Sequence, residues 1–466
     1  MGSNDMQWQS YLDQNHERFD EELLDFLRIP SVSTDSERTE DVRRAAEWVR
    51  RRLRAAGVPY LELIETDRHP VVFGRWVTAE NKPTVLLYGH YDVQPAEPLE
   101  LWTSPPFEPT IRDGRLFARG SADMKANMTS LIHAIEAIGK TSGQLPVNLL
   151  FLFEGEEEIG SPNLPAVVQQ RKDQLRADVA LSADGGMQGK SGPSLSVGLK
   201  GLAGCQIDVR TGQSDLHSGG YGATVPNAVQ VLVQLAASFH KPDGTVAVEG
   251  FYDDVRPLTA REKQAIAAIT QDDETFLAEA GTLGLWGEPG FTPLERRWLR
   301  PTVDFNGIWG GFQGQGAKTV TPCEAHAKIT CRLVPGQTPE TIMRLIRAHI
   351  EKHAPAYAEI TIDPLKGSAH PYTLDLDSPS LAAAVAALRN VYGVDPQFVR
   401  SGGTVPITDV FRRELSIDTV TIGFALPGSR SHAPNEWFEL ADLPIARRVY
   451  ATYLCNLGEQ QIALDQ

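Results

Sequence analysis

The sequence is poor in cysteine, in basic residues and in long apolar runs, and each shortage excludes a class of protein. Its four cysteines, Cys205, Cys323, Cys331 and Cys455, lie far apart, which excludes a cysteine-rich zinc module. Lysine and arginine total 44 against 60 aspartates and glutamates, and the net charge of -16 disfavours nucleic acid or an anionic membrane surface as a partner. No segment approaches the roughly 18 consecutive apolar residues that cross a bilayer.

The first residues, Met1–Met6, have neither the basic nor the apolar region of a signal peptide. Together with the dispersed cysteines, this predicts a cytoplasmic protein in a reducing compartment. A chain of 466 residues predicts two or three domains.

The beginning of the chain has the pattern of an α/β domain. Apolar runs that read as buried strands cover residues 85–90, 147–153 and 178–183, and apolar residues at helical spacing lie between them. We therefore predict a central, mostly parallel sheet flanked by helices over residues 1–200, completed by residues 372–466.

Between these two parts the pattern changes to that of a small α+β domain. Apolar and polar residues alternate over three predicted strands, near residues 205–209, 327–334 and 358–362. Helices are predicted at 226–240 and from Thr338-Pro339 onward, where an N-cap residue precedes proline. Residues 201–371 are thus expected to form an inserted domain with an antiparallel sheet.

Polar side chains follow several strands of the predicted α/β domain. The candidates are His90, Asp92, Asp123, Glu157, Glu158, Asp184 and His432. Singly, each has an ordinary interpretation: an acidic triplet is typical of a solvated turn, Asp184 before two glycines is typical of a turn, and His432 could be a loop histidine. Their coincidence at strand ends of one domain indicates a shared crevice.

Such a cluster of acids repels itself unless cations compensate, and a dinuclear metal site is the simplest arrangement that supplies them. Imidazole and carboxylate ligands suit zinc and manganese. Paired metals activate a bridging water, for which a further carboxylate serves as general base. Glu157 and Glu158 can divide these tasks, and Asp92, two residues beyond His90, can hold its imidazole.

The combined motifs resemble those of the M20 family of metallopeptidases, and within it the cytosolic non-specific dipeptidase and carnosinase branch. They are His90-Tyr91-Asp92-Val93-Gln94-Pro95, Gly120-Ser121-Ala122-Asp123-Met124-Lys125, Glu157-Glu158-Ile159-Gly160-Ser161, Asp184 and His432-Ala433-Pro434-Asn435-Glu436. The resemblance implies a catalytic domain with two divalent metal ions, zinc or else manganese, and an inserted lid domain that forms a homodimer.

Position by position, the resemblance implies that Asp123 bridges the two ions. His90 and Asp184 would complete one metal site, and Glu158 and His432 the other. Glu157 would be the general base, and Asp92 would orient His90. The resemblance also implies a cis peptide bond between Asp123 and Met124.

The lid carries further matches. Asp215-Leu216-His217-Ser218-Gly219 resembles the family segment whose histidine reaches the partner subunit's active site and stabilises the oxyanion. Arg332 resembles the ligand of the substrate carboxylate, although a strand arginine is by itself most often solvated. Gly403 and Thr404 lie in Ser401-Gly402-Gly403-Thr404-Val405-Pro406, which resembles the glycine-rich substrate loop.

We therefore expect a metal-dependent hydrolase that cleaves the amide bond of dipeptides or short peptides with a free C-terminal carboxylate, through a metal-bridged water and Glu157. An N-acyl-amino-acid or N-carbamoyl amidohydrolase on the same site is the first alternative, and a catalytically silent binding protein is the second. The stretch from about Pro242 to Arg300 matches no motif of the family and is expected to shape the pocket or the dimer surface.

Overall fold

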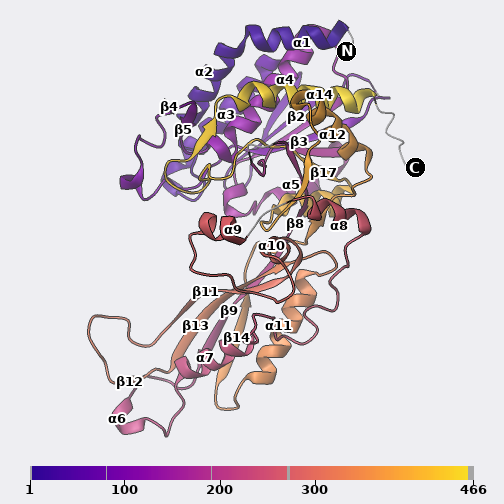
Figure 1. Cartoon of the computed structure of the whole chain (residues 1–466). Coiled ribbons are helices and arrows are strands. Elements are labelled where there is room, and N and C mark those ends of the chain that lie inside the picture. Colours follow the sequence, from indigo (N-terminus) through magenta and orange to yellow (C-terminus); the bar gives the residue numbers. More distant parts are fainter. Residues whose placement is uncertain (1–2, 80, 190–191, 270–272, 460–466) are drawn as a thin grey trace. The chain divides into compact units, whose positions relative to one another are not determined.

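The computed structural model describes residues 3–79, 81–189, 192–269 and 273–459 (Figure 1). Its contacts divide the chain into two compact units. The first comprises Met1–Val197, Leu374–Val399 and Val410–Gln466, and the second comprises Gly198–Thr373 and Arg400–Asp409.

The first unit is built on a mixed sheet whose central strands are parallel. The strand order is β1-β2-β6-β3-β7-β17-β8. The four consecutive strands β6, β3, β7 and β17 are parallel to one another. The outer strands β1, β2 and β8 pair with their neighbours in antiparallel fashion. The expected α/β class is confirmed. The strands are β1 (Tyr60–Ile64), β2 (Val71–Trp76), β3 (Thr84–His90), β6 (Asn148–Glu154), β7 (Val179–Ser182), β8 (Ser194–Leu199) and β17 (Thr419–Thr421), with β15 (Tyr372–Thr373) and β16 (Gln397–Ser401) also paired to β8.

Burial explains why these strands read as continuous apolar runs. Every residue of β6 is buried, and so are six of the seven residues of β3, because helices cover both faces of the sheet. The helices of this unit are α1 (Ser3–Gln14), α2 (His16–Leu27), α3 (Thr39–Ala56), α4 (Ala126–Ser142), α5 (Leu164–Gln170), α12 (Pro379–Tyr392) and α14 (Asp442–Glu459), with α13 (Pro406–Val410) at the unit boundary. Helix α3 ends at Gly57, whose φ of 107° few other residues adopt.

A three-stranded sheet beside the central one was not predicted. Its order is β18-β5-β4, formed by β18 (Trp437–Glu439), β5 (Arg115–Phe117) and β4 (Thr110–Arg112). These strands are only three residues long, too short to show a period in the sequence. The sheet joins the loop that carries Asp123 to the loop that carries His432, so it contributes directly to the site.

The second unit has a four-stranded antiparallel sheet with helices on one face, as expected for an α+β domain. The order is β11-β13-β9-β14, from β11 (Thr302–Gly310), β13 (Glu324–Leu333), β9 (Gly201–Arg210) and β14 (Glu359–Pro364). Three strands were predicted and β11 was missed. A break in register between Phe305 and Gly307 interrupts its alternation of apolar and polar residues, which hides the strand in the sequence.

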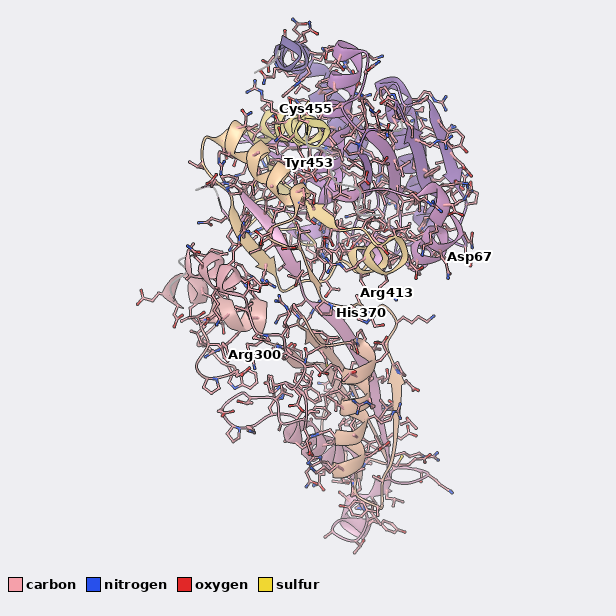
Figure 2. The ribbon with its side chains drawn as sticks, turned by 90° about the vertical axis from the view of Figure 1, so that its right-hand side faces the viewer. Asp67, Arg300, His370, Arg413, Tyr453 and Cys455 are labelled. Atoms are coloured by element: carbon pink, nitrogen blue, oxygen red, sulfur yellow. The ribbon has the colours of Figure 1, made fainter. Side chains whose placement is uncertain are left out.

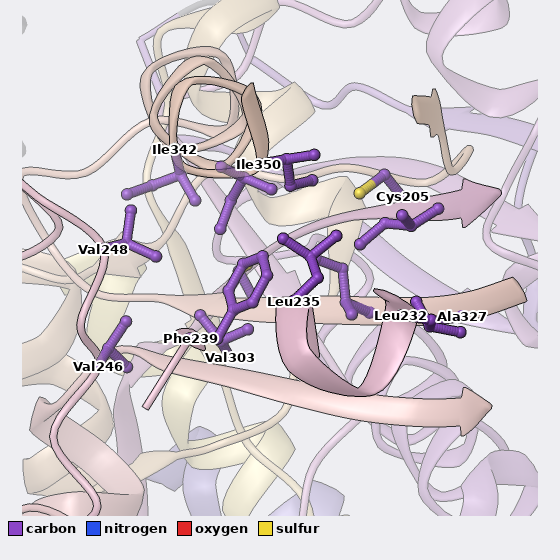
Figure 3. Packing of buried hydrophobic residues seen from close by; sticks show 14 of the residues in the cluster. Cys205, Leu232, Leu235, Phe239, Val246, Val248, Val303, Ala327, Ile342 and Ile350 are labelled. Atoms are coloured by element: carbon purple, nitrogen blue, oxygen red, sulfur yellow. The ribbon is translucent and has the colours of Figure 1, made fainter. Parts of the chain in front are cut away.

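The core of the second unit lies between this sheet and helices α7 and α11. Leu232, Leu235 and Phe239 from α7 and its end meet Ile342 and Ile350 of α11 (Figure 3). Thr338 caps α11 by accepting a hydrogen bond from the Thr341 amide, and Pro339 occupies its first turn, as predicted. The helices are α6 (Ser218–Tyr221), α7 (Ala228–Ser238), α8 (Ala260–Ala267), α9 (Asp273–Ala280), α10 (Pro293–Leu299) and α11 (Pro339–His353), and a short ladder joins β10 (Leu216–His217) to β12 (Val320–Thr321).

The segment Arg400–Asp409 groups with the second unit, whereas the sequence analysis placed it with residues 372–466. Its backbone explains the difference. The Lys200 amide donates hydrogen bonds to the carbonyls of Ser401 and Gly403, and the Thr404 hydroxyl donates to the Lys200 carbonyl at 2.6 Å. These bonds couple the glycine-rich segment to the start of β9.

Candidate active site

The end of β3 positions His90 with a defined tautomer. The imidazole is fully buried, and its Nδ1 donates a hydrogen bond to the backbone carbonyl of Asp92 at 3.0 Å. A carbonyl oxygen can only accept, so Nδ1 carries a proton and Nε2 is the ring nitrogen left to bind a metal ion. Nε2 lies 3.2 Å from Oδ1 of Asp123. His90 is therefore arranged as a ligand through Nε2.

Asp92 holds both this imidazole and the turn after β6. Its buried carboxylate lies 3.5 Å from Nδ1 of His90, farther than its own backbone carbonyl. The same carboxylate accepts hydrogen bonds from the amides of Glu157 and Glu158, at 3.3 and 3.1 Å. Asp92 thus connects the ends of the two parallel strands β3 and β6.

Asp123 lies on a loop that is held by hydrogen bonds to Glu436. The peptide bond between Asp123 and Met124 is cis, as expected. The buried Glu436 carboxylate accepts from the amides of Gly120, Ala122 and Asp123 at 2.8 to 3.0 Å. It also accepts from the buried guanidinium of Arg119 at 2.7 Å.

Glu436 was quoted in the sequence motif, but no role was predicted for it. Its partners are backbone amides more than 300 positions away, which no spacing in the sequence reveals. It follows His432 by four residues, and Nε2 of His432 lies 3.0 Å from Oδ2 of Asp123. Glu436 therefore fastens the His432 loop to the Asp123 loop.

Glu158 is the second carboxylate that contacts His432, besides Asp123. Its Oε2 is 3.2 Å from Nε2 of His432 and accepts a hydrogen bond from the Gln94 amide nitrogen at 2.8 Å. Gln94 was likewise part of a motif without an assigned role. Glu156, the first residue of the acidic triplet 156–158, is buried and accepts hydrogen bonds from the His69 amide and the Thr66 hydroxyl. It therefore stabilises the turn after β6.

The structure brings the predicted metal ligands and Glu157 together around His90. Within the described residues, two sets of three ligand atoms lie within 4.8 Å of one another and could each hold a metal ion. One set is His90, Asp123 and Glu158, and the other is His90, Glu157 and Asp184. His432 adjoins the first set through Asp123 and Glu158.

The electrostatics of this cluster show why cations fit it. Burial, and then the negative charge of Asp123, raises the pKa of Asp184 to about 7. Burial also raises the pKa of Glu157 well above its usual range, and neighbouring carboxylates add to the effect. Hydrogen bonds to Asp123 and Glu158 raise the pKa of His432 to about 10. Acids that resist ionisation and imidazoles that hold protons mark a donor set in which divalent cations can replace those protons.

The other predicted site residues belong to the second unit. Arg332 donates a hydrogen bond from Nη1 to the Thr404 hydroxyl at 2.8 Å. The Gly403 amide donates to the Ser401 hydroxyl at 3.0 Å. His217 is exposed on β10, and its Nδ1 accepts from the Gly219 amide at 2.9 Å, which leaves Nε2 as the protonated nitrogen.

Across the described residues, no helix combines the length and the apolarity that a membrane crossing demands.

Comparison with known proteins identifies the family. The model of peptidase family M20/M25/M40 matches residues 86–456. The Cys-Gly metallodipeptidase dug1 of Schizosaccharomyces pombe is 30% identical, over 96% of this chain and 97% of its own length. The β-Ala-His dipeptidase of Mus musculus is 28% identical, over 84% of this chain and 80% of its own length.

A solved structure of another M20 family enzyme is also similar to this chain. The M20 family metallo-carboxypeptidase Sso-CP2 from Sulfolobus solfataricus superposes with a TM-score of 0.84 at 32% identity, over 94% of this chain and 98% of that one. This chain belongs to peptidase family M20/M25/M40. It is a metallopeptidase, and the predicted likeness to the dipeptidase and carnosinase branch is confirmed.

Proposed function

We propose that this enzyme hydrolyses the amide bond of dipeptides or short peptides that end in a free carboxylate. The observation that carries the proposal is the cluster around His90, where candidate ligands from five chain segments meet beside Glu157. Cys-Gly and β-Ala-His, named for the relatives in Schizosaccharomyces pombe and Mus musculus, are the first substrates to consider.

Two divalent metal ions, zinc or manganese, would be held by His90, Asp123, Glu158, Asp184 and His432. When bound, they would act as Lewis acids on the scissile carbonyl and on the attacking water. Asp123 is suited to a bridging position because its two oxygens face different histidines, His90 and His432. Glu158 is tied to Gln94 and His432, which leaves Glu157 as the carboxylate available for proton transfer.

Glu157 would take the proton of the attacking water and deliver it to the leaving amine. Between the two steps its carboxyl must hold that proton. Arg332 would bind the terminal carboxylate with its guanidinium, braced by the Thr404 hydroxyl, while the backbone at Gly403 approaches the substrate. His217 would donate from Nε2 to the carbonyl oxygen as charge develops there.

We further propose a homodimer formed by the second unit. Large apolar side chains are exposed there on α6, α7, β11 and the loop after β11; they are Tyr221, Val233, Ile308, Trp309 and Phe312. Strand β11 is also an edge of its sheet, a position that proteins usually cover or pair. We propose a cytoplasmic location as well, supported by the presence of Cys205, Cys323 and Cys331 as thiols rather than disulfides.

The first test is amine release from Cys-Gly, β-Ala-His, alanyl dipeptides and N-acetylated amino acids, after removal of metals and restoration of zinc or manganese. We expect metal-dependent cleavage of dipeptides. Glu157→Gln should lower kcat by roughly a hundredfold or more, the usual contribution of a general base. Glu65→Gln, at an exposed glutamate paired with Arg43, is the matched control and should retain full activity.

The panel separates the alternatives. Cleavage of acetylated amino acids alone would reassign the enzyme as an amidohydrolase. Dipeptide cleavage that persists in Glu157→Gln would remove that residue from the proposed role.

A further inference from the structure

The second unit contains a cavity of about 420 Å³ whose lining includes Arg332. This volume lies within the usual range of small-molecule sites, roughly 300 to 1,000 Å³. Gly402 of the glycine-rich segment also lines the cavity, next to Gly403. The remaining walls come mainly from α10 and from the segment Leu285–Glu288, within the stretch that matches no family motif.

The segment that forms this wall is firmly anchored. Arg296 donates hydrogen bonds to the backbone carbonyls of Glu288 and Trp286, at 2.8 and 3.4 Å. The Glu288 carboxylate forms a two-point ion pair with Arg300, with both distances 2.8 Å (Figure 2 labels Arg300). Gly287 has a φ of 126° and packs so closely that a Cβ on Gly244 would lie 2.8 Å from its Cα. The backbone is thus fixed by bonds and by close contact.

On this anchored backbone the Trp286 side chain is 67% exposed. Its ring forms a T-shaped pair with His240, with ring centroids 5.5 Å apart. Leu285 beside it is exposed as well, and Tyr252 and Phe276 continue the apolar lining. Exposed aromatic surface held by a rigid backbone is typical of a recognition surface.

The cavity lining also carries more cations than carboxylates. Five cations line it against two carboxylates; they are Lys200, Arg296, Arg297, Arg300 and Arg332 against Glu288 and Asp304. Lys200 is buried, and its ammonium donates to the backbone carbonyls of Arg296 and Arg300 at the end of α10, while the negative charge of Asp304 offsets its charge in part. A positively charged substrate side chain that entered this cavity would be repelled by these cations.

We propose that this cavity receives the side chain of the substrate's C-terminal residue, favouring large apolar and above all aromatic side chains and rejecting lysine and arginine. This rests on the proposed function, in which Arg332 binds the terminal carboxylate. The carboxylate and the side chain of an amino acid are attached to the same α-carbon. A cavity that includes the carboxylate ligand in its lining is therefore where that side chain goes.

The test measures kcat/KM for Ala-Gly, Ala-Phe, Ala-norleucine, Ala-Lys and Ala-Glu with the metal-loaded enzyme. Ala-Phe should exceed Ala-Gly about tenfold, because an aromatic ring gains burial against Trp286. Ala-norleucine should exceed Ala-Lys at least tenfold, since these side chains have similar length and differ in charge. Trp286→Ala should reduce the ratio of Ala-Phe to Ala-Gly about tenfold, and Trp286→Phe should restore most of it.

Leu283→Ala is the matched control, because Leu283 is fully exposed on the same segment and does not line the cavity. It should leave every ratio unchanged. A Trp286→Ala variant with the wild-type ratio, or a preference for Ala-Lys or Ala-Glu over Ala-Phe, would overturn the assignment of this cavity while leaving the dipeptidase proposal intact. Failure to cleave any dipeptide would defeat the proposed function, and this inference with it.

Discussion

At the scale of single residues, the site depends on groups that touch no substrate. Glu436 is buried and binds three backbone amides and the Arg119 guanidinium. Each of these bonds to a charged acceptor is stronger than one between neutral groups. Glu436 accepts a hydrogen bond from the Asp123 amide and lies four residues after His432 in the sequence. It therefore fixes the separation of Asp123 and His432, two proposed metal ligands.

Replacing Glu436 by glutamine should therefore weaken metal binding. The amide keeps one acceptor oxygen, but its NH₂ group faces amides and a guanidinium that can only donate. We expect metal affinity to fall roughly tenfold or more, as for other residues that orient ligands. Competition with a chromogenic chelator measures this directly.

Glu439→Gln, at the end of strand β18, which begins directly after Glu436, is the control and should leave the affinity unchanged. A Glu436→Gln protein that unfolds at lower temperature but binds metal as tightly as the wild type would show a purely structural role.

At the scale of elements, the short ladder of β10 and β12 carries His217, and the exposed apolar residues of the second unit form the surface that we propose for a second copy. If His217 acts in the partner's site, then His217→Ala and Glu157→Gln inactivate different halves of one composite site. In a heterodimer of the two variants, one of the two sites would contain neither mutation.

Mixed dimers of these variants should therefore regain activity that neither variant has alone. Random exchange makes about half of the dimers mixed, each with one intact site, which predicts about a quarter of wild-type activity. Co-expression with two different affinity tags isolates the mixed dimers. Mixed dimers as inactive as their parents would place His217 in its own subunit's site, and a monomeric protein would remove the arrangement altogether.

At the scale of the whole molecule, the sequence predicts the elements whose patterns are long. The apolar run of β3, the alternation in β9 and β13 and the capped start of α11 all appear as expected. The convergence of His90, Glu157, Glu158 and Asp184 was predictable too, because the parallel strands β3, β6 and β7 end at one edge of the sheet.

Interactions between distant segments could not be predicted in this way. Strand β11 is hidden by its irregular register, and the three-residue strands β4, β5 and β18 have no detectable period. The grouping of Arg400–Asp409 with the second unit depends on hydrogen bonds to Lys200, some 200 positions earlier. The wall around Trp286 depends on contacts such as that between Gly244 and Gly287, which a single sequence does not disclose.

We propose above all that the cluster around His90 holds two metal ions that support peptide hydrolysis. The most direct measurement titrates zinc or manganese into the metal-stripped enzyme while following cleavage of a dipeptide and the amount of bound metal. We predict no activity without metal and a rise in turnover that ends at two equivalents per subunit. Saturation at one equivalent, or turnover that is independent of metal, would contradict the account.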